Sequence, residues 1–504
     1  MTGQGGEKNS PPDDLPDELK ADDSKQSSAP VEYFEEFSDE ADRPAAAVPT
    51  QALLEEEAPG GTRLRHDPYE ALRSRNYLLF SIGALIASIG NQMQNVAVGW
   101  EIYSRVSTQY GSTPEGIKQG ALALGIVGLI QALPVIFLAL PAGQLADRYD
   151  RRRIVLFAQL LLASCWVGLA CASFTKAPLP WFYFFLLLDG IANALTNPAR
   201  TALIPQLIPQ QTIPNATMWN STRHQIASTS GPALGGAAIA YLGGPSPVYI
   251  VAIVAALIFT LFLCFIKPRP VEHSREPVSL DTLLMGARFV LGTPIILATV
   301  TLDMFAVLLG GAVALLPVFA KDILHVGPEG YGWLLAAQAI GALAMTISVA
   351  HLPPMKHAGK TLLYAVIGFG LATIAFGLSR NFYLSFAALF LCGAFDAISV
   401  VVRHTLVQVL TPDHLRGRVS AVNSVFIGVS NEIGSFESGA VARLIGPIAA
   451  VVAGGVGTVL VATGVGWRWP VVRHIGSLQD AAKEYAPVES QERDKGSDET
   501  SRTV

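Results

Sequence analysis

The sequence predicts an all-α integral membrane protein with twelve transmembrane helices in two six-helix pseudo-repeats. Of its 504 residues, 51% are hydrophobic and only 15% are charged, whereas ordinary soluble domains carry about 25% charged residues. Apolar windows recur along the chain, and each is long enough to cross a hydrocarbon core of roughly 30 Å as an α-helix. The second half of the chain also repeats residues of the first half in one register.

Six of the apolar windows lie in each half of the chain. A helix needs about 20 mainly apolar residues to span a bilayer, and this rule sets the predicted boundaries. The windows cover residues 77–103, 120–141, 153–173, 181–200, 217–241, 247–267, 294–319, 330–350, 361–379, 383–408, 418–441 and 445–466.

The two ends of the chain are polar. The first 60 residues are rich in acids, Pro and Ser, and because such a segment cannot bury a core, we expect it to be disordered. It lacks the basic start and apolar core of a signal peptide, so the first spanning helix should itself direct insertion. We predict an acidic tail over residues 1–70, a six-helix half over 71–267, a central cytoplasmic connection over 268–292, a second six-helix half over 293–467 and a polar C-terminal tail over 468–504.

Basic residues are concentrated in alternate connections. Lys and Arg are retained on the cytoplasmic side of a membrane, so this bias places both termini in the cytoplasm. The other connections hold only scattered cations, such as Lys118, Lys176, Lys321 and Arg380. The predicted inside connections carry Arg73, Arg75, Arg148, Arg151, Arg152, Arg153, Lys267, Arg269, Arg275, Lys356, Lys360, Arg416 and Arg418.

A shift of 203 residues superposes polar and helix-breaking residues of the two halves. The matches include Gly190 on Gly393, Arg200 on Arg403, Pro209 on Pro412, Asn220 on Asn423, Gly231 on Gly434 and Gly236 on Gly439. Matched Arg, Pro, Asn and Gly in one register indicate a duplication. Between the halves, Leu280, Leu283, Leu284 and Ala287 follow helical spacing, which predicts either a helix on the cytoplasmic interface or the start of a buried helix.

The turn between windows 120–141 and 153–173 is the most specific motif. Its residues Gly143, Asp147, Arg148, Arg151 and Arg152 resemble the signature G-x-x-x-D-R-x-x-R-R of the major facilitator superfamily. The resemblance implies the fold of that superfamily, with a substrate site near the bilayer midplane between two halves. It also implies that this loop, Asp147 above all, holds the halves together on the inner side when the cavity faces outward. A basic turn that only sets topology is the alternative.

The window over residues 217–241 contains a second motif. Gly231, Pro232, Gly235 and Gly236 resemble the G-P-x-x-G-G signature of antiporters in this superfamily, which are mostly exporters. Ala227, Gly231 and Gly235 recur every four residues, so another helix could also pack closely on this stripe. Export and generic helix packing both remain possible at this point.

Polar residues inside the spans are the candidates for a substrate or proton pathway, because they are costly in lipid and face a cavity or a partner. A carboxylate there can couple proton entry to substrate exit, because a proton and a cation compete for its charge. Structural ion pairs and interhelical hydrogen bonds would explain the same residues. The candidates are Asn91, Gln94, Asn95, Asp189, Asn193, Arg223, Asp303, Asp396 and Glu432.

The sequence contains no CxxC, HExxH or GxSxG motif and no complete G-x-x-x-x-G-K-S/T phosphate loop. We therefore expect no enzyme activity, no cofactor or metal, and no ATP hydrolysis within this chain. The four cysteines all lie inside apolar windows and should be packing residues. We expect membrane lipid, a small-molecule substrate and protons as partners, but no nucleic acid, and a monomeric protein.

Further stretches resemble one branch of the superfamily. Residues 197–207, 315–319 and 415–419 are similar to enterobactin exporters and macrolide efflux proteins. This resemblance implies a proton-coupled exporter of bulky amphiphilic molecules, such as siderophores or macrolide drugs, in the inner or plasma membrane. Two alternatives remain: a transporter that moves lysophospholipids between leaflets, and a non-transporting membrane sensor or scaffold whose acidic tail recruits partners.

Overall fold

The computed structural model describes residues 67–269, 280–353 and 355–477. The chain divides into two units, Met1–His66 and Asp67–Val504, and all described residues lie in the second unit. The predicted acidic tail therefore lies almost wholly outside the described residues, as do part of the central connection and most of the C-terminal tail.

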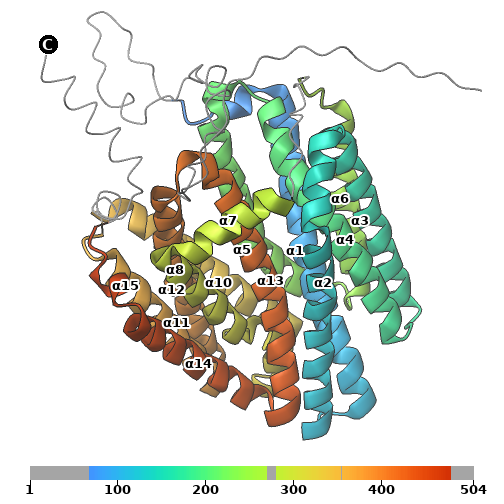
Figure 1. Ribbon diagram of the computed structural model, residues 1–504. Coiled ribbons are helices and arrows are strands. Elements are labelled where there is room, and N and C mark those ends of the chain that lie inside the picture. Colours follow the sequence, from blue (N-terminus) through green and yellow to red (C-terminus); the bar gives the residue numbers. More distant parts are fainter. Residues whose placement is uncertain (1–66, 270–279, 354, 478–504) are drawn as a thin grey trace, which may run out of the picture. The chain divides into compact units, whose positions relative to one another are not determined.

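The first half of the described chain consists of long α-helices joined by short turns (Figure 1). Polar side chains cap some of them; for example, Thr113 accepts a hydrogen bond from the Gly116 N–H (3.1 Å) at the start of α2. The elements are η1 (Ala71–Arg73), α1 (Arg75–Tyr110), α2 (Pro114–Arg148), α3 (Arg151–Phe174), α4 (Leu179–Leu203), η2 (Ile204–Gln206), η3 (Gln210–Thr212), α5 (Ile213–Tyr241) and α6 (Ser246–Phe265).

The second half is also helical. Its first helix, α7, packs on α13, where Gly286 lies against the Arg418 backbone. The short α15 lies in the segment predicted as a tail and packs on α11, where Gly359 lies against the Val472 carbonyl. The elements are α7 (Leu280–Gly292), α8 (Pro294–Leu309), η4 (Ala312–Leu315), α9 (Leu316–Val318), η5 (Phe319–Ile323), α10 (Gly327–His351), α11 (Ala358–Leu378), α12 (Phe382–Leu410), α13 (Asp413–Ile445), α14 (Pro447–Arg468) and α15 (Pro470–His474).

Within the described residues, nine helical segments are long and apolar enough to cross a membrane. The three other long helices, α1, α5 and α13, have 36, 29 and 33 residues, but their polar residues lower their hydropathy. These three pack among the nine, at the positions where the sequence predicts spans. The prediction of an all-α membrane fold is confirmed, while the number of twelve spans stays a prediction.

The window predicted over residues 294–319 is not one continuous helix. The helix α8 ends at Leu309, and the chain continues through η4, α9 and the single π-helical turn η5. A Cβ added to Gly311 would approach the Gly434 carbonyl to 2.8 Å. The break therefore lies where the chain passes close to the backbone of α13.

The halves meet through two pairs of glycines. Gly439 of α13 packs on the backbone of Gly125 in α2, and Gly236 of α5 packs on the backbone of Gly332 in α10. In Figure 1, α2 and α13 run side by side between the halves. Because Gly236 and Gly439 are equivalent in the 203-residue repeat, the two contacts form a pseudo-symmetric pair. Backbones approach this closely only where neither residue has a side chain.

Further contacts close the end of the molecule opposite the α2–α3 turn. Arg443 of α13 forms an ion pair with Glu115 of α2 (2.7 Å), and Lys118 Nζ donates to the Leu444 carbonyl (3.3 Å). On the other side, the hydroxyl of Tyr103 in α1 donates to the carboxylate of Asp322 in η5. We call this closed end the outer end, because the arginine distribution predicts that the α2–α3 turn is cytoplasmic.

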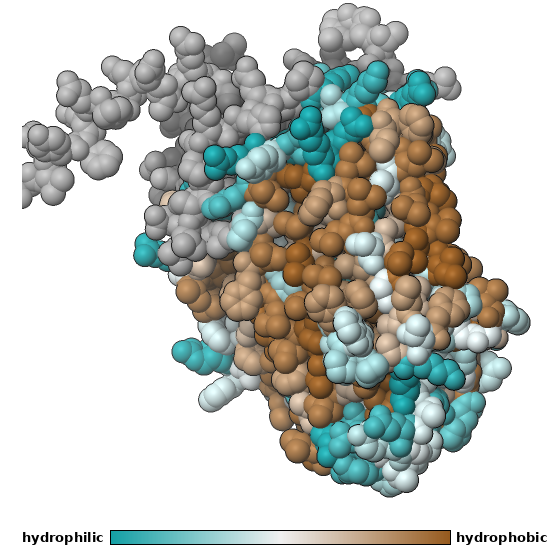
Figure 2. Space-filling model, turned by 90° about the vertical axis from the view of Figure 1, so that its right-hand side faces the viewer, coloured by the Kyte–Doolittle hydropathy of each residue, from teal (hydrophilic) through white to brown (hydrophobic). Residues whose placement is uncertain are grey.

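One face of the molecule is covered in its middle by apolar side chains, with hydrophilic side chains toward both ends (Figure 2). Large apolar residues are exposed on the spanning helices, including Phe137, Phe157, Leu261 and Leu460. Exposed apolar area of this extent is unfavourable in water and favourable in lipid. This surface agrees with a multi-pass membrane protein.

The Gly439 contact yields a first prediction. A Gly439→Leu substitution should force α2 and α13 apart at the outer end, because overpacking costs about 1–3 kcal/mol. An energy of this size shifts the equilibrium between the closed and the open outer end by about 5- to 150-fold. In a background without native cysteines, Ala121→Cys should then react faster with a membrane-impermeant maleimide, since Ala121 is buried against Gly439.

Gly464→Leu is the matched control, because a Cβ added at Gly464 meets nothing within 4 Å. Equal labelling rates in Gly439→Leu and the control would show that the glycine contact does not hold the outer end closed.

Candidate functional site

A cavity of about 1490 Å³ lies between the two halves. Its walls come from α1, α2, α4 and α5 of the first half and from η4, α9, α10, α12 and α13 of the second. The lining reaches Thr201 near the end of α4 and Gly417 near the start of α13. Both lie at the end that carries the α2–α3 turn, so the cavity opens toward the predicted cytoplasmic side and is closed at the outer end.

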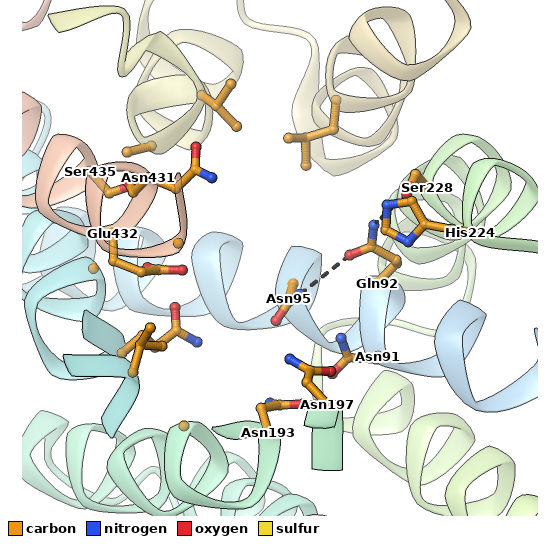
Figure 3. Close-up of a pocket in the computed structure, with 18 of the residues that line it drawn as sticks. Asn91, Gln92, Asn95, Asn193, Asn197, His224, Ser228, Asn431, Glu432 and Ser435 are labelled. Carbon is orange, nitrogen blue, oxygen red and sulfur yellow. Dashed lines mark hydrogen bonds between the residues drawn. The ribbon is translucent and has the colours of Figure 1, made fainter. Parts of the chain in front are cut away.

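Neutral amide side chains dominate the polar part of the lining. Figure 3 shows several of them around the open space, together with His224 and Ser228 of α5 and Glu432 of α13. Gln92 donates to Ser228 (3.4 Å) and accepts from Asn95 (3.4 Å). The amides are Asn91, Gln92, Asn95, Gln131, Asn193, Asn197, Gln225, Gln338 and Asn431.

Asp189 of α4 touches the cavity wall but is itself only 1% exposed. Its carboxylate accepts hydrogen bonds from Trp166 Nε1 of α3 (2.8 Å) and from Asn193 Nδ2 one turn further along α4 (3.0 Å). Two donors therefore satisfy this charge within the first half. The arrangement suits a structural carboxylate that joins α3 to α4.

Asp303 of α8 forms an ion pair with Arg403 of α12, and both side chains are buried. The pair does not line the large cavity. Asp303 instead borders a second cavity of about 10 Å³, whose lining also includes Ser399 and Asp396. A space of this size holds about one water molecule.

Asp396 and Glu432 differ from the other two acids. Both line the large cavity, and neither forms a hydrogen bond or an ion pair with its side chain among the described residues. Asp396 borders both cavities, whereas Glu432 points into the large one (Figure 3). The described cavity thus has two carboxylates without a protein partner.

Among the other predicted residues, Asn91, Asn95 and Asn193 line the cavity, whereas Gln94 and Arg223 do not. Gln94 is fully buried between helices, and its amide has no hydrogen-bond partner within the described part of the chain. Arg223 donates to Ser88 Oγ of α1 (3.2 Å) and to Asn220 Oδ1.

The glycine motif of α5 packs against two helices. Gly231 and Gly235 lie against α1, next to Gln92 and Met93, while Gly236 lies against α10 of the second half. Pro232 is part of the cavity lining. The motif therefore serves close packing at the cavity wall, and the export direction that its resemblance implies stays a prediction.

The α2–α3 turn is held by contacts inside the first half. Arg151 Nη1 donates to the Ala202 carbonyl near the end of α4 (3.2 Å), and Arg152 donates to the Leu263 (2.9 Å) and Cys264 (2.7 Å) carbonyls at the end of α6. Because cations are favourable at helix C-termini, Arg151 and Arg152 stabilise the ends of α4 and α6.

The remaining turn residues give less information. A Cβ added at Gly143 meets nothing within 4 Å, Arg148 is exposed, and the side chain of Asp147 lies outside the described part of the structure. The predicted locking role concerns the opposite state of the cavity, in which the inner ends would meet. It therefore stays a prediction.

Several functional candidates were missed by the sequence reading. Gln131 and Gln338 line the cavity from the apolar helices α2 and α10, where a single amide in an otherwise apolar window was the only signal. The buried Glu101 of α1 forms an ion pair with the partly exposed Arg105 (2.6 Å) and accepts a hydrogen bond from the Tyr249 hydroxyl (2.9 Å). Among the described residues, no group of three or more His, Cys, Asp or Glu could hold a metal ion.

Comparison with known proteins gives one family and several similar chains. Residues 66–492 match the family described as transmembrane secretion effector. The chain is 27% identical over 320 residues to the enterobactin exporter of Shigella dysenteriae serotype 1. The aligned residues cover 63% of this chain and 76% of that exporter.

Two solved structures share the fold. The nucleoside transporter NupG superposes with a TM-score of 0.62 at 13% identity, covering 78% of this chain and 100% of that chain. A bacterial homolog of the human lysosomal transporter Spinster, in an inward-facing and occupied conformation, superposes with a TM-score of 0.61 at 15% identity, covering 81% and 99%.

The Asp303–Arg403 pair yields a second prediction. Arg403→Leu should destabilise the protein by about 3–5 kcal/mol, because it leaves a buried carboxylate without its partner. The double variant Arg403→Leu/Asp303→Leu should recover much of this loss, since it removes both charges. Thermal unfolding of the purified protein in detergent measures both effects.

Arg443→Leu is the control, because the Arg443–Glu115 pair is partly exposed (31% and 60% of the side chains) and such pairs contribute about 0–1 kcal/mol. A double variant that is less stable than Arg403→Leu would argue against a structural pair and for a separate role of Asp303.

Proposed function

Because the chain belongs to the transmembrane secretion effector family of the major facilitator superfamily, in the branch of the enterobactin exporters, we propose that this transporter is a proton-coupled exporter of bulky amphiphilic molecules. The cavity between the halves carries the proposal. It is large, lined by both amides and apolar side chains, and open toward the predicted cytoplasmic side. An exporter must load its substrate from that side.

Alternating access requires that the closed and open ends exchange. The contacts that close the outer end include two glycine pairs, one partly exposed ion pair, a few hydrogen bonds and the stacked rings of Trp100 and Tyr331. At the glycine pairs the backbones meet directly, but beside Gly332 the ring of Tyr331 stacks on Trp100 of the first half, so this aromatic contact must also break when the outer end opens. At the inner end, the α2–α3 turn with Asp147 and Arg148 would approach the second half when the cavity closes.

Asp396 is the proposed proton carrier. Its carboxylate lies between the large cavity and the water-sized cavity that borders Asp303. A water molecule in the small cavity would connect the Asp396 carboxylate to the Asp303–Arg403 pair by hydrogen bonds. A proton taken up by Asp396 removes a negative charge from the cavity wall, which changes the affinity for a bound molecule.

Transport itself is the third prediction. In proteoliposomes that contain the purified protein, an amphiphilic dye should move against its gradient when a proton gradient is imposed, and a protonophore should abolish this movement. Fluorescent lysophospholipid flip is measured in the same vesicles. Lysolipid movement without dye transport would support the lysophospholipid alternative, and the absence of both would contradict a transport function.

The fourth prediction concerns coupling. Asp396→Asn should lose proton-driven accumulation but keep gradient-independent exchange of labelled for unlabelled substrate, because the amide cannot carry the proton while the cavity keeps its shape. Ser424→Ala, which also alters the cavity lining, should keep both activities. Proton-driven accumulation at the wild-type level in Asp396→Asn would remove this residue from the coupling mechanism.

A further inference from the structure

We infer that the substrate of this cavity carries a positive charge on an otherwise apolar body, and that Glu432 is the residue that binds this charge. This inference rests on the proposed transport function. It narrows the substrate class from amphiphilic molecules in general to amphiphilic cations.

The charges on the cavity wall are the first observation. Among the described residues that line it, the ionisable side chains are three carboxylates, the imidazole of His224 and the phenol of Tyr331, with no lysine or arginine. Negative charge thus prevails on the wall. An anionic molecule in this space would meet carboxylates without a compensating guanidinium or ammonium group.

Nearby arginines are directed away from the cavity. Arg223 donates to α1 and to its own helix, and Arg403 is paired with Asp303. The guanidinium of Arg200 lies over the ring of Phe259 at 5.3 Å. None of these side chains belongs to the described lining, so none of them neutralises its carboxylates directly.

Glu432 is the carboxylate best placed for a ligand. Asp189 is satisfied by two donors, and Asp396 lies partly in the small cavity. Glu432 points into the large cavity from α13, in the same view as the polar groups of Asn431 and Ser435 (Figure 3). Its backbone carbonyl lies against Gly128 of α2, so the side chain stands at the junction of the two halves.

The surroundings of Glu432 fit a cation with apolar substituents. A carboxylate without a protein partner can bind a cationic ligand through a charge-assisted hydrogen bond or ion pair. Apolar side chains in the same lining, such as Val127, Val135 and Leu335, offer contact area to the rest of the molecule. The amides can accept or donate hydrogen bonds but cannot replace the charge.

Binding to the purified full-length protein in detergent tests the inference. Fluorescence polarisation measures the affinity for rhodamine 6G, a cation, for fluorescein, an anion, and for Nile red, which is neutral. Rhodamine 6G should bind most tightly, and Glu432→Gln should weaken its binding roughly tenfold to a hundredfold, as expected for a lost charge-assisted contact. Nile red binding should change little.

Glu437→Gln is the matched control. Glu437 lies on the same helix, is half-buried and accepts a hydrogen bond from Ser438 (3.4 Å), but does not line the described cavity. Its substitution should leave rhodamine 6G binding unchanged, which separates the position of Glu432 from the general loss of one negative charge.

The binding and transport assays separate the cation inference from the proposed export function. Binding of rhodamine 6G that is equally tight in Glu432→Gln and wild type, or tighter binding of fluorescein, overturns the inference. If the wild-type protein then still transports fluorescein or Nile red in a proton-dependent way, the proposed export function stands without it. If the wild-type protein binds none of the three dyes, the inference is wrong, and the transport assay decides separately on the proposed function.

Discussion

The hydrocarbon core of the membrane is the constraint on which this structure depends. Because lipid offers no hydrogen bonds, every polar side chain on a spanning helix needs a partner or a water-filled cavity. The described acids satisfy this rule in two ways. Asp189 and Asp303 are paired inside one half each, whereas Asp396 and Glu432 face the space between the halves. The cavity is thus the place where the two carboxylates without a protein partner lie.

The same constraint determines how the halves hold together. Between helices in lipid there is little hydrophobic driving force, so close backbone packing and a few polar contacts must provide the attraction. Gly125 with Gly439 and Gly236 with Gly332 provide such packing at the outer end. Smooth glycine surfaces also separate more easily than interlocked side chains. The glycine contacts at the closed end are thus of a kind that a transport cycle can break.

Hydropathy and charge predicted most of the fold, because spans and basic connections are properties of continuous segments. They did not predict the break after α8, since Gly310 and Gly311 lie inside an apolar window and the break reflects the approach of α13. The candidate acids were all visible in the sequence, but their roles were not. Trp166, which satisfies Asp189, lies on another helix, and only the folded structure brings the two together.

The internal repeat shows how a duplicated scaffold becomes asymmetric. The 203-residue shift pairs Asn193 with Asp396 and Thr229 with Glu432, so the second half has a carboxylate where the first half has a neutral side chain. Asn193 and Asp396 both line the cavity. The one acid on the wall of the first half, Asp189, is already bound by protein donors. Both walls therefore carry amides, but only the wall of the second half carries carboxylates without a protein partner, so a molecule with a single charged end would bind in one orientation.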